Sequence, residues 1–264
     1  MTRCTTQPAK KILSLTLAIA ITLGATVTAT GCARSVDPHT GMKTSSINDP
    51  LEPVNRAVFT FNNALDIVLI EPVAYVYSTF VPPFAQTGIR NFMRNLRSPF
   101  LVANSLLQGN INGAGVATAR FLINTTAGIG GLVDVAGMNG LAYQQEDLGQ
   151  TLAVWGMGDG FYLVLPVIGP SSARDIIGTT AEAYGDPLRI WTHKTGRDWV
   201  YYTRNAVEGL DNRAQLLDAI ADLRRNSLDY YAAVRSAYAQ KRRALIHNEN
   251  PDAPTTPVIP DYDE

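Results

Sequence analysis

The side chains that carry most enzyme chemistry are few and scattered in this chain. Its 264 residues include three histidines and two cysteines. His39 lies in a polar N-terminal stretch, His193 in a polar turn, and His247 near the end of the last helical segment. The motifs of serine hydrolases, zinc proteases, thiol redox proteins and P-loop NTPases do not occur. We therefore expect no catalytic residue, no metal site and no cofactor.

Two neighbouring pairs of charged residues could take part in acid–base chemistry, namely Glu146-Asp147 and Arg174-Asp175. Acid–base catalysis also requires a reacting group within hydrogen-bond reach. The sequence offers no nucleophile to stand beside either pair, as a lipid hydrolase would need. We interpret both pairs as structural or solvated ion pairs and expect that the protein is not an enzyme.

Two glycine-rich stretches, 128–138 and 156–160, differ from phosphate-binding loops. A G-x-G-x-x-G fingerprint from Gly128 would need glycine at Val133, and one from Gly156 would need glycine at Phe161. Close helix packing and tight turns are the use of these glycines that we favour.

The N-terminus has the layout of an export signal that ends in a cysteine. Basic residues precede an apolar, uncharged run at 12–27, and small residues lead to Cys32. Ala29 to Cys32 resemble the bacterial lipobox, whose cysteine is acylated after cleavage and anchors the protein durably in a bilayer. Ala33 follows, and no aspartate stands there to resemble the inner-membrane retention signal, which favours the outer membrane. An uncleaved anchor helix or an unmodified cysteine is the alternative.

These features predict four segments. We expect a lipoprotein signal peptide at 1–31 and an acylated cysteine with a flexible polar tether at 32–48. A folded domain follows at 49–250, and a disordered tail at 251–264 alternates proline with acidic residues.

Charge is unevenly distributed within the expected domain. Residues 51–190 contain seven arginines, ten acidic residues and no lysine, whereas residues 191–250 contain 17 charged residues in 60. We interpret the second region as ordinary solvated helices. The first region is unusually apolar, which favours helices that lie in a membrane interface over a plain helical bundle. The net charge of −1 excludes a basic nucleic-acid-binding protein.

Apolar residues recur with helical spacing, but in short segments. The helix candidates are 54–68, 89–96, 116–126, 173–184 and 216–223. We expect Pro72, Pro82 and Pro83 to break the uncharged stretch that begins at 72, and Pro99 to break the next. Neither stretch then supplies the roughly twenty apolar residues of a spanning helix. Residues 161–166 predict a single strand or an extended segment.

Several motifs, in one order along the chain, resemble the MlaA (VacJ) family of lipoproteins. The opening motif is Asn-Asp-Pro-x-Glu-x-x-Asn-Arg at 48–56, followed by Phe59 and Phe61-Asn62. The further matches are Val81-Pro82, 104–109, Arg120-Phe121, Asn124-Thr125, 131–138, Leu165-Pro166 and 169–175. The resemblance covers about residues 48–245, together with the lipobox.

The resemblance implies a mainly α fold in which short amphipathic helices form a ring around a central amphipathic channel, embedded in the periplasmic leaflet of the outer membrane. It implies retrograde transport of mislocalised phospholipid from the outer leaflet, with a trimeric porin and the soluble periplasmic carrier MlaC as partners. Residues 51–190 would form the embedded ring, and 191–250 would face the periplasm or a partner. A structural lipoprotein or porin-associated scaffold, without direct lipid translocation, is the alternative.

The resemblance also suggests which residues meet the lipid. The segment 132–144 matches a loop beside the family's channel and is a candidate gate, with a plain turn as the alternative. Arginine suits lipid phosphate because its planar fork donates two hydrogen bonds at once. The channel or gate candidates are Gly128, Gly130, Gly131, Leu132, Val133, Asp134, Val135, Gly137 and Met138; the phosphate-contact candidates are Arg90, Arg94, Arg120 and Arg174; the lipidation candidate is Cys32.

Overall fold

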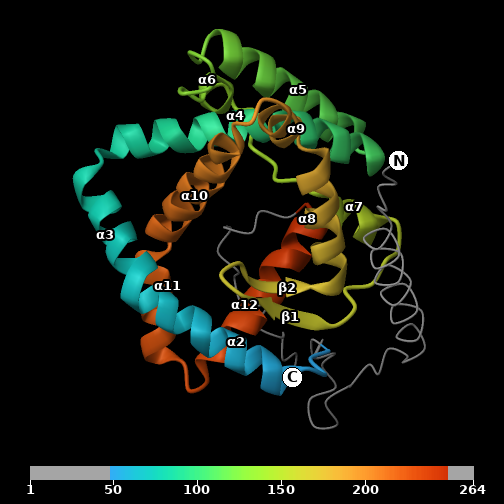
Figure 1. Cartoon of the computed structure of the whole chain (residues 1–264). Coiled ribbons are helices and arrows are strands. Elements are labelled where there is room, and N and C mark those ends of the chain that lie inside the picture. The colour runs from blue at the N-terminus through green and yellow to red at the C-terminus, as the bar shows by residue number, and fades with distance from the viewer. Residues whose placement is uncertain (1–47, 249–264) are drawn as a thin grey trace, which may run out of the picture. The chain divides into compact units, whose positions relative to one another are not determined.

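Helices make up nearly all of the regular structure in the computed structural model, which describes residues 48–248. The elements are α2 (Glu52–Leu65), the π-helix η1 (Asp66–Ile70), α3 (Glu71–Phe80), α4 (Pro83–Leu107), α5 (Ile111–Thr126), α6 (Val135–Met138), α7 (Leu148–Val154), β1 (Tyr162–Leu165), β2 (Gly169–Ser172), α8 (Ala173–Gly185), α9 (Pro187–Lys194), α10 (Asp198–Gln215), α11 (Leu217–Asn226) and α12 (Tyr230–Ile246) (Figure 1). The expected mainly α fold is confirmed.

Several expectations fall outside the described residues. The signal peptide, Cys32, His39, the tether up to residue 47 and the proline-rich tail all lie there. The four-segment division of the chain therefore stays a prediction.

The first helical elements form one helix from Glu52 to Phe80, so the expected break at Pro72 is wrong. Pro72 stands in the first turn of α3, directly after the π-helical segment η1. The wider π turn accommodates a ring that would clash inside a regular α-helix. By length and composition this helix could cross a membrane, and 6% of its most apolar window of 18 residues is buried.

α4 is also longer than expected, because it runs for 25 residues through Pro99. Contacts with α5, α7 and α10 hold α4 in place, so tertiary packing overrides the local preference of proline. The break comes instead after Leu107, where Gly109 adopts a φ of 76°. The side chain of Asn110 then caps α5 by accepting a hydrogen bond from the Gly113 N–H at 2.8 Å.

β1 and β2 form an antiparallel hairpin, of which the sequence predicted only the first strand. Two asparagines of α2 cover the free edge of β1. Asn55 accepts from the Val164 N–H at 2.9 Å and donates to the Tyr162 carbonyl at 3.0 Å. Asn62, two helical turns later, makes the equivalent bonds to the Val167 N–H and the Leu165 carbonyl. Side-chain amides therefore take the place of a third strand.

Contacts between the elements form a closed circuit within the described residues (Figure 1). α2 packs on β1, β2 contacts α8, and α8 packs on α7. α7 then contacts α4, α4 contacts α10, and α10 packs on α3, which leads back to α2 through η1. This order of neighbours is what a ring requires; the amphipathic channel itself stays a prediction.

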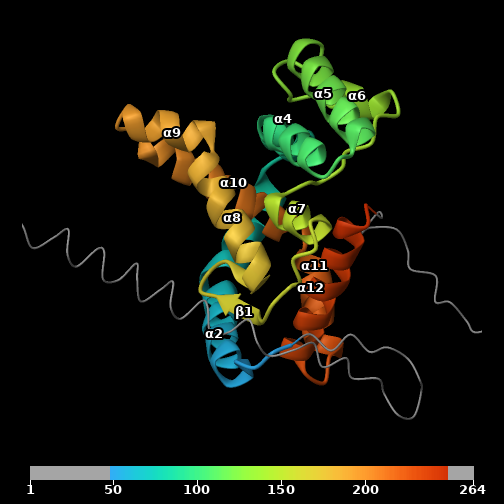
Figure 2. The same ribbon diagram turned by 90° about the vertical axis from the view of Figure 1, so that its right-hand side faces the viewer.

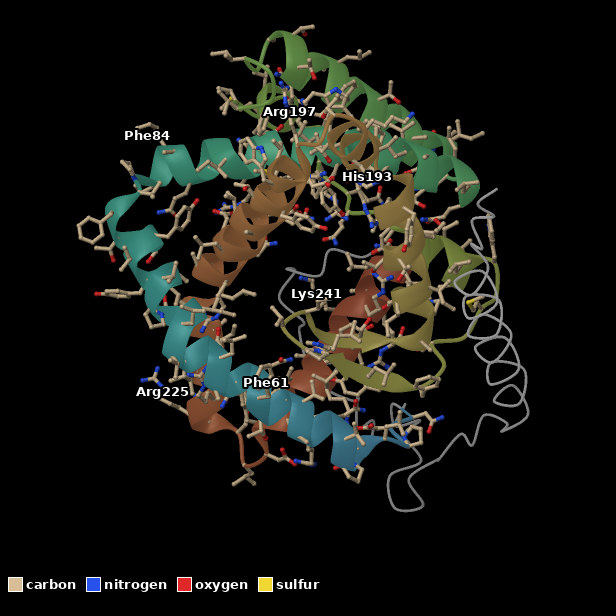
Figure 3. All side chains as sticks on the ribbon, in the orientation of Figure 1. Phe61, Phe84, His193, Arg197, Arg225 and Lys241 are labelled. Carbon is tan, nitrogen blue, oxygen red and sulfur yellow. The ribbon has the colours of Figure 1, made fainter. Side chains whose placement is uncertain are left out.

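The polarity of the fold is the reverse of that in an ordinary soluble domain. Among residues 48–248, nine hydrophobic residues are buried against 17 polar or charged ones. Large apolar side chains instead lie on the surface of α2, η1, α3 and the start of α4, such as Val68 (78% exposed), Phe80 (78%) and Phe84 (80%). Figure 3 shows Phe84 directed away from the other elements. Soluble monomers rarely expose apolar surface on this scale.

Ion pairs join the region of low charge to the region of high charge. The pairs between them are Arg56–Asp229, Arg90–Asp211, Arg97–Glu208, Asp66–Arg213, Glu71–Arg224, Asp186–Arg204 and Asp147–Arg242. The expectation that 191–250 forms ordinary solvated helices is therefore wrong, because many of their charges face opposite charges of 51–190. Exposed pairs such as Arg225–Asp222 are the exception.

We predict that Arg242→Ala destabilises the protein by about 3–5 kcal/mol, because it removes the arginine that two enclosed carboxylates share. Arg242 donates to Asp147 at 2.6 and 2.7 Å and to Asp175 at 2.8 Å, and all three side chains are less than a fifth exposed. Unfolding in detergent micelles measures the loss. The control Arg225→Ala removes a pair that is 73% and 63% exposed and is expected to cost less than about 1 kcal/mol. Equal losses in the two variants would contradict this account.

Candidate functional site

A tight left-handed turn after α5 leads into the predicted gate segment 132–144. Ile129, Gly130 and Gly131 have φ values of 55°, 68° and 98°. This conformation is uncommon for a β-branched residue such as Ile129 and is natural for glycine. At Gly131 a Cβ would lie 2.6 Å from the Asn95 Cβ, so the absent side chain allows α4 to approach the turn closely.

The other glycines of this segment differ in their surroundings. A Cβ at Gly128 would collide with the backbone of Asn124 and with the Val133 carbonyl, whereas one at Gly130 would meet nothing within 4 Å. A Cβ at Gly137 would collide with the Asp134 carboxylate. Most of these glycines therefore serve close packing, the use that we favoured from the sequence.

Asp134 fastens the predicted gate to α5. Its carboxylate accepts hydrogen bonds from Arg120 at 2.9 and 3.0 Å, from the Asn124 amide at 2.9 Å, and from the Gly137 N–H at 2.9 Å. The last of these bonds caps the short helix α6. Asn124 also accepts from the Ala136 N–H, and Arg120 donates to the Leu141 carbonyl. The segment is thus a loop with one helical turn, held to α5 by these hydrogen bonds; its role as a gate stays a prediction.

The hydrogen bonds that Arg120 and Asn124 make to Asp134 are called the clamp here. The remaining gate candidates are neighbours of Asp134 in the chain. Leu132 is 46% exposed and Met138 is 79% exposed, while Val133 and Val135 are half-buried. The clamp therefore holds a backbone that presents two apolar side chains at the surface.

The clamp controls the ionisation of Asp134. Burial alone would raise the pKa of this carboxyl, but the hydrogen bonds from Arg120, Gly137 and Asn124 outweigh it and lower the pKa below the usual 3.8. These hydrogen bonds therefore stabilise the loop at neutral pH, and this stabilisation is lost only as the pH falls through the lowered pKa of Asp134.

Three of the four predicted phosphate contacts already bind carboxylates. Arg90 pairs with Asp211 at 3.0 Å and Arg120 with Asp134. Arg174, 3% exposed, pairs with Asp159 at 2.6 Å and with Asp175. The pair of Arg174 with its neighbour Asp175 was expected from the sequence. Sequence reasoning could not foresee the partners Asp211, Asp134 and Asp159, since they come from other elements or loops.

Arg94 differs from the other three predicted phosphate contacts. It is exposed on α4 and has no carboxylate partner among the described residues, and its guanidinium lies 4.6 Å from the centre of the Tyr143 ring. Tyr143 belongs to the predicted gate segment but was not among the candidates, because a single tyrosine gives no signal in the sequence. Burial raises the pKa of Tyr143 despite the three nearby arginines, so its hydroxyl stays a neutral donor.

A small polar cavity lies where the gate segment meets α4 and α5. Its volume is about 10 Å³, and it is lined by Asn91, Arg94, Asn95, Ser98, Arg120, Asn124, Asp134 and Tyr143. This size suits a single water molecule. Guanidinium and amide donors at its rim could bind an anionic group held outside it.

The pairs that could have performed acid–base chemistry have structural roles. Asp147 caps α7 through the Gln150 N–H and binds Arg242. Glu146 is 1% exposed and accepts from the Gln108 amide, and burial raises its pKa. Within residues 48–248, no group of three or more His, Cys, Asp or Glu residues could hold a metal ion. His193 stands in the last turn of α9, 3.5 Å from Asp198, and His247 caps the end of α12.

Comparison with known proteins identifies relatives along most of the chain. The family model described as MlaA lipoprotein matches residues 47–245. The intermembrane phospholipid transport system lipoprotein MlaA of Escherichia coli K12 is 37% identical over 246 residues, which cover 89% of this chain and 92% of the relative. The protein of the same name from Haemophilus influenzae is 33% identical and covers 83% of this chain and 86% of the relative.

A solved structure is also similar to this chain. It comes from work on the structural basis for maintenance of bacterial outer membrane lipid asymmetry. The TM-score is 0.67 at 39% sequence identity, with 75% of this chain and 99% of that chain covered.

We predict that Asp134→Ala releases the segment 132–144 from α5. Amide hydrogen exchange in this segment is expected to accelerate, since the four hydrogen bonds that Arg120, Asn124 and Gly137 donate to the carboxylate are lost. In the wild type, exchange protection should persist from neutral pH to about pH 4, because the pKa of Asp134 is lowered. The matched control is Asp218→Ala, which removes an exposed carboxylate of α11. Unchanged exchange in Asp134→Ala would show that the clamp does not hold the loop.

Proposed function

Because the chain belongs to the MlaA lipoprotein family, we propose that it removes mislocalised phospholipid from the outer leaflet of the outer membrane and passes it to a soluble periplasmic carrier of the MlaC type. The names of its Escherichia coli and Haemophilus influenzae relatives support a role in intermembrane phospholipid transport. In this proposal the protein preserves lipid asymmetry and performs no covalent chemistry.

The reversed polarity of the fold is the observation that carries the proposal. Apolar side chains cover the outer face of α2, η1 and α3, while polar and charged side chains are buried. Such a surface suits the acyl chains of one leaflet, and buried polar groups suit a path for a headgroup. An amphipathic channel needs both kinds of wall, since a phospholipid has a charged head and apolar tails.

The long helix Glu52–Phe80 lies along the leaflet in this proposal and does not cross it. Near its middle, Asp66 and Glu71 bind Arg213 and Arg224 of α10 and α11. A spanning orientation would bring these four charges towards the centre of the bilayer, where ionised side chains are costly. An orientation in the plane keeps the ion pairs on the protein side and the apolar face in lipid.

The membrane anchor and the partners complete the proposal. An acylated Cys32 would hold the chain in the periplasmic leaflet, and two or three acyl chains suffice for durable anchoring. The apolar outer face would also suit the lipid-facing wall of a trimeric porin. A carrier would collect the lipid on the periplasmic side.

We predict that a strain without this protein shows excess phospholipid in its outer leaflet. The wild-type gene should correct the excess, whereas Cys32→Ala should not, because the unacylated chain loses its anchor. Labelling of surface-exposed phospholipid measures both outcomes, and immunoblotting of membrane fractions confirms that the variant is produced. A deletion strain with normal surface phospholipid would contradict the proposal and leave the scaffold as the better account.

We predict that Arg94→Ala slows lipid removal severalfold while association with the porin persists. Arg94 is the predicted phosphate contact whose guanidinium binds no carboxylate of the described residues, so its loss removes a donor for the lipid headgroup. Arg225→Ala, which removes another surface arginine, is the control. Loss of porin association and lipid removal together would favour the scaffold. Release of lysophospholipid or fatty acid by the purified protein would instead indicate a hydrolase.

A further inference from the structure

A second exposed apolar surface differs in composition from the one on α2 and α3. It is formed by residues 184–202, which comprise the end of α8, the helix α9 and the start of α10, and is called the α9 tip here. Its aromatic side chains include Tyr184 (70% exposed), Trp191 (47%), Trp199 (67%) and Tyr202 (66%). Figure 2 shows α9 standing to one side of the other elements.

Basic side chains accompany these rings. Arg189 lies 4.5 Å from the centre of the Tyr184 ring, and Arg197 lies 5.9 Å from that of Trp191. Neither arginine forms an ion pair with a described residue, and Lys194 has no partner among residues 48–248. His193 and Arg197 both lie at the junction of α9 and α10 (Figure 3).

Acidic side chains do not neutralise the α9 tip. Asp186 is 7% exposed and binds Arg204 at 2.8 Å. The other acid, Asp198, lies 3.5 Å from the exposed His193. The tip therefore presents three basic side chains and one accessible carboxylate, which leaves it positively charged.

Different depths of a membrane favour different side chains. Tryptophan and tyrosine concentrate at the level of the headgroups, where the ring is in contact with lipid and its polar edge meets water. Lysine and arginine extend from there to the phosphates. The outer face of α2, η1 and α3 is instead rich in valine, isoleucine, leucine and phenylalanine, which suit the acyl chains.

We propose that the α9 tip is a second membrane contact, in which its tryptophans and tyrosines lie among phospholipid headgroups and its free basic side chains bind their phosphates. This inference rests on the proposed function, because it takes the outer face of α2 and α3 to lie in the acyl region of the same leaflet. In this arrangement, the side of the molecule that carries α9 faces the headgroups of that leaflet. An acidic protein partner is less favoured, since the tip exposes four broad aromatic side chains, which lipid can surround without a surface of matching shape.

The test uses the tryptophans of the tip as reporters in the full-length acylated protein. The chain has three tryptophans, so Trp155→Phe leaves Trp191 and Trp199. The protein is reconstituted into vesicles of phosphatidylcholine and phosphatidylglycerol that carry a nitroxide either on the headgroup or deep in the acyl chain. We expect strong quenching of the emission by the headgroup nitroxide and severalfold weaker quenching by the deep one. Iodide in the water should quench weakly.

Charge reversal at the tip supplies the matched comparison. Lys194→Glu with Arg197→Glu should reduce quenching by the headgroup nitroxide severalfold, because the anionic surface then repels the tip. The control variant, Lys241→Glu with Arg225→Glu, changes the net charge by the same amount. Both of its positions are exposed and lie outside the tip, so quenching should stay unchanged. Circular dichroism checks that both variants keep their helices.

The outcomes separate this inference from the proposed function. Strong iodide quenching in protein that still floats with the vesicles would overturn the headgroup contact alone and indicate that the tip faces a soluble partner. Equal loss of quenching in the two charge-reversed variants would also overturn it. Protein that no longer floats with vesicles would contradict the membrane-embedded function itself.

Discussion

The pairing of arginines with carboxylates from distant parts of the chain is the constraint on which this fold depends. The hydrophobic residues buried among 48–248 are few and include four alanines, so apolar burial alone does not select which helices meet. A charge removed from water must be compensated by a partner, and breaking a buried pair is costly. Arg213 and Arg224, bound to Asp66 and Glu71, thereby determine where α10 and α11 lie against the first long helix. Arg242 fixes α12 to the start of α7 and of α8 in the same way.

This arrangement suits a leaflet better than it suits water. Ion pairs enclosed by lipid and protein experience a low dielectric constant, which strengthens the attraction between partners and raises the cost of an unpaired charge. The outer surface is then free to be apolar, as the exposed side chains of α2, η1 and α3 are. Arg94 differs from these paired arginines, because among the described residues it lies against the ring of Tyr143 and binds no carboxylate. The same low dielectric would favour its binding to a lipid phosphate.

The sequence predicted the helical class, the approximate position of several helices and the family, since apolar spacing and short motifs are local signals. It did not predict that helices continue through Pro72 and Pro99. A π turn precedes Pro72 and accommodates its ring, whereas packing against neighbouring helices holds α4 together at Pro99. The strand 169–172, with the sequence Gly-Pro-Ser-Ser, has little strand preference and is formed through its partner β1. The sequence suggested Arg90, Arg120 and Arg174 as phosphate contacts, but it did not predict their partners Asp211, Asp134 and Asp159. No periodicity encodes a pair such as Arg90–Asp211, whose members lie 121 residues apart.

The depth of the apolar face in the membrane tests the central claim most directly. A nitroxide attached to cysteine at position 68, where Val68 is 78% exposed on η1, can be compared with one at position 218, where Asp218 is exposed on α11. In vesicles, the account predicts that oxygen, which dissolves in lipid, relaxes the label at position 68, and that a water-soluble nickel chelate does not. The label at position 218 should respond more strongly to the chelate. If the chelate reaches both labels equally, the apolar face lies in water or against another protein, and the membrane-embedded account is contradicted.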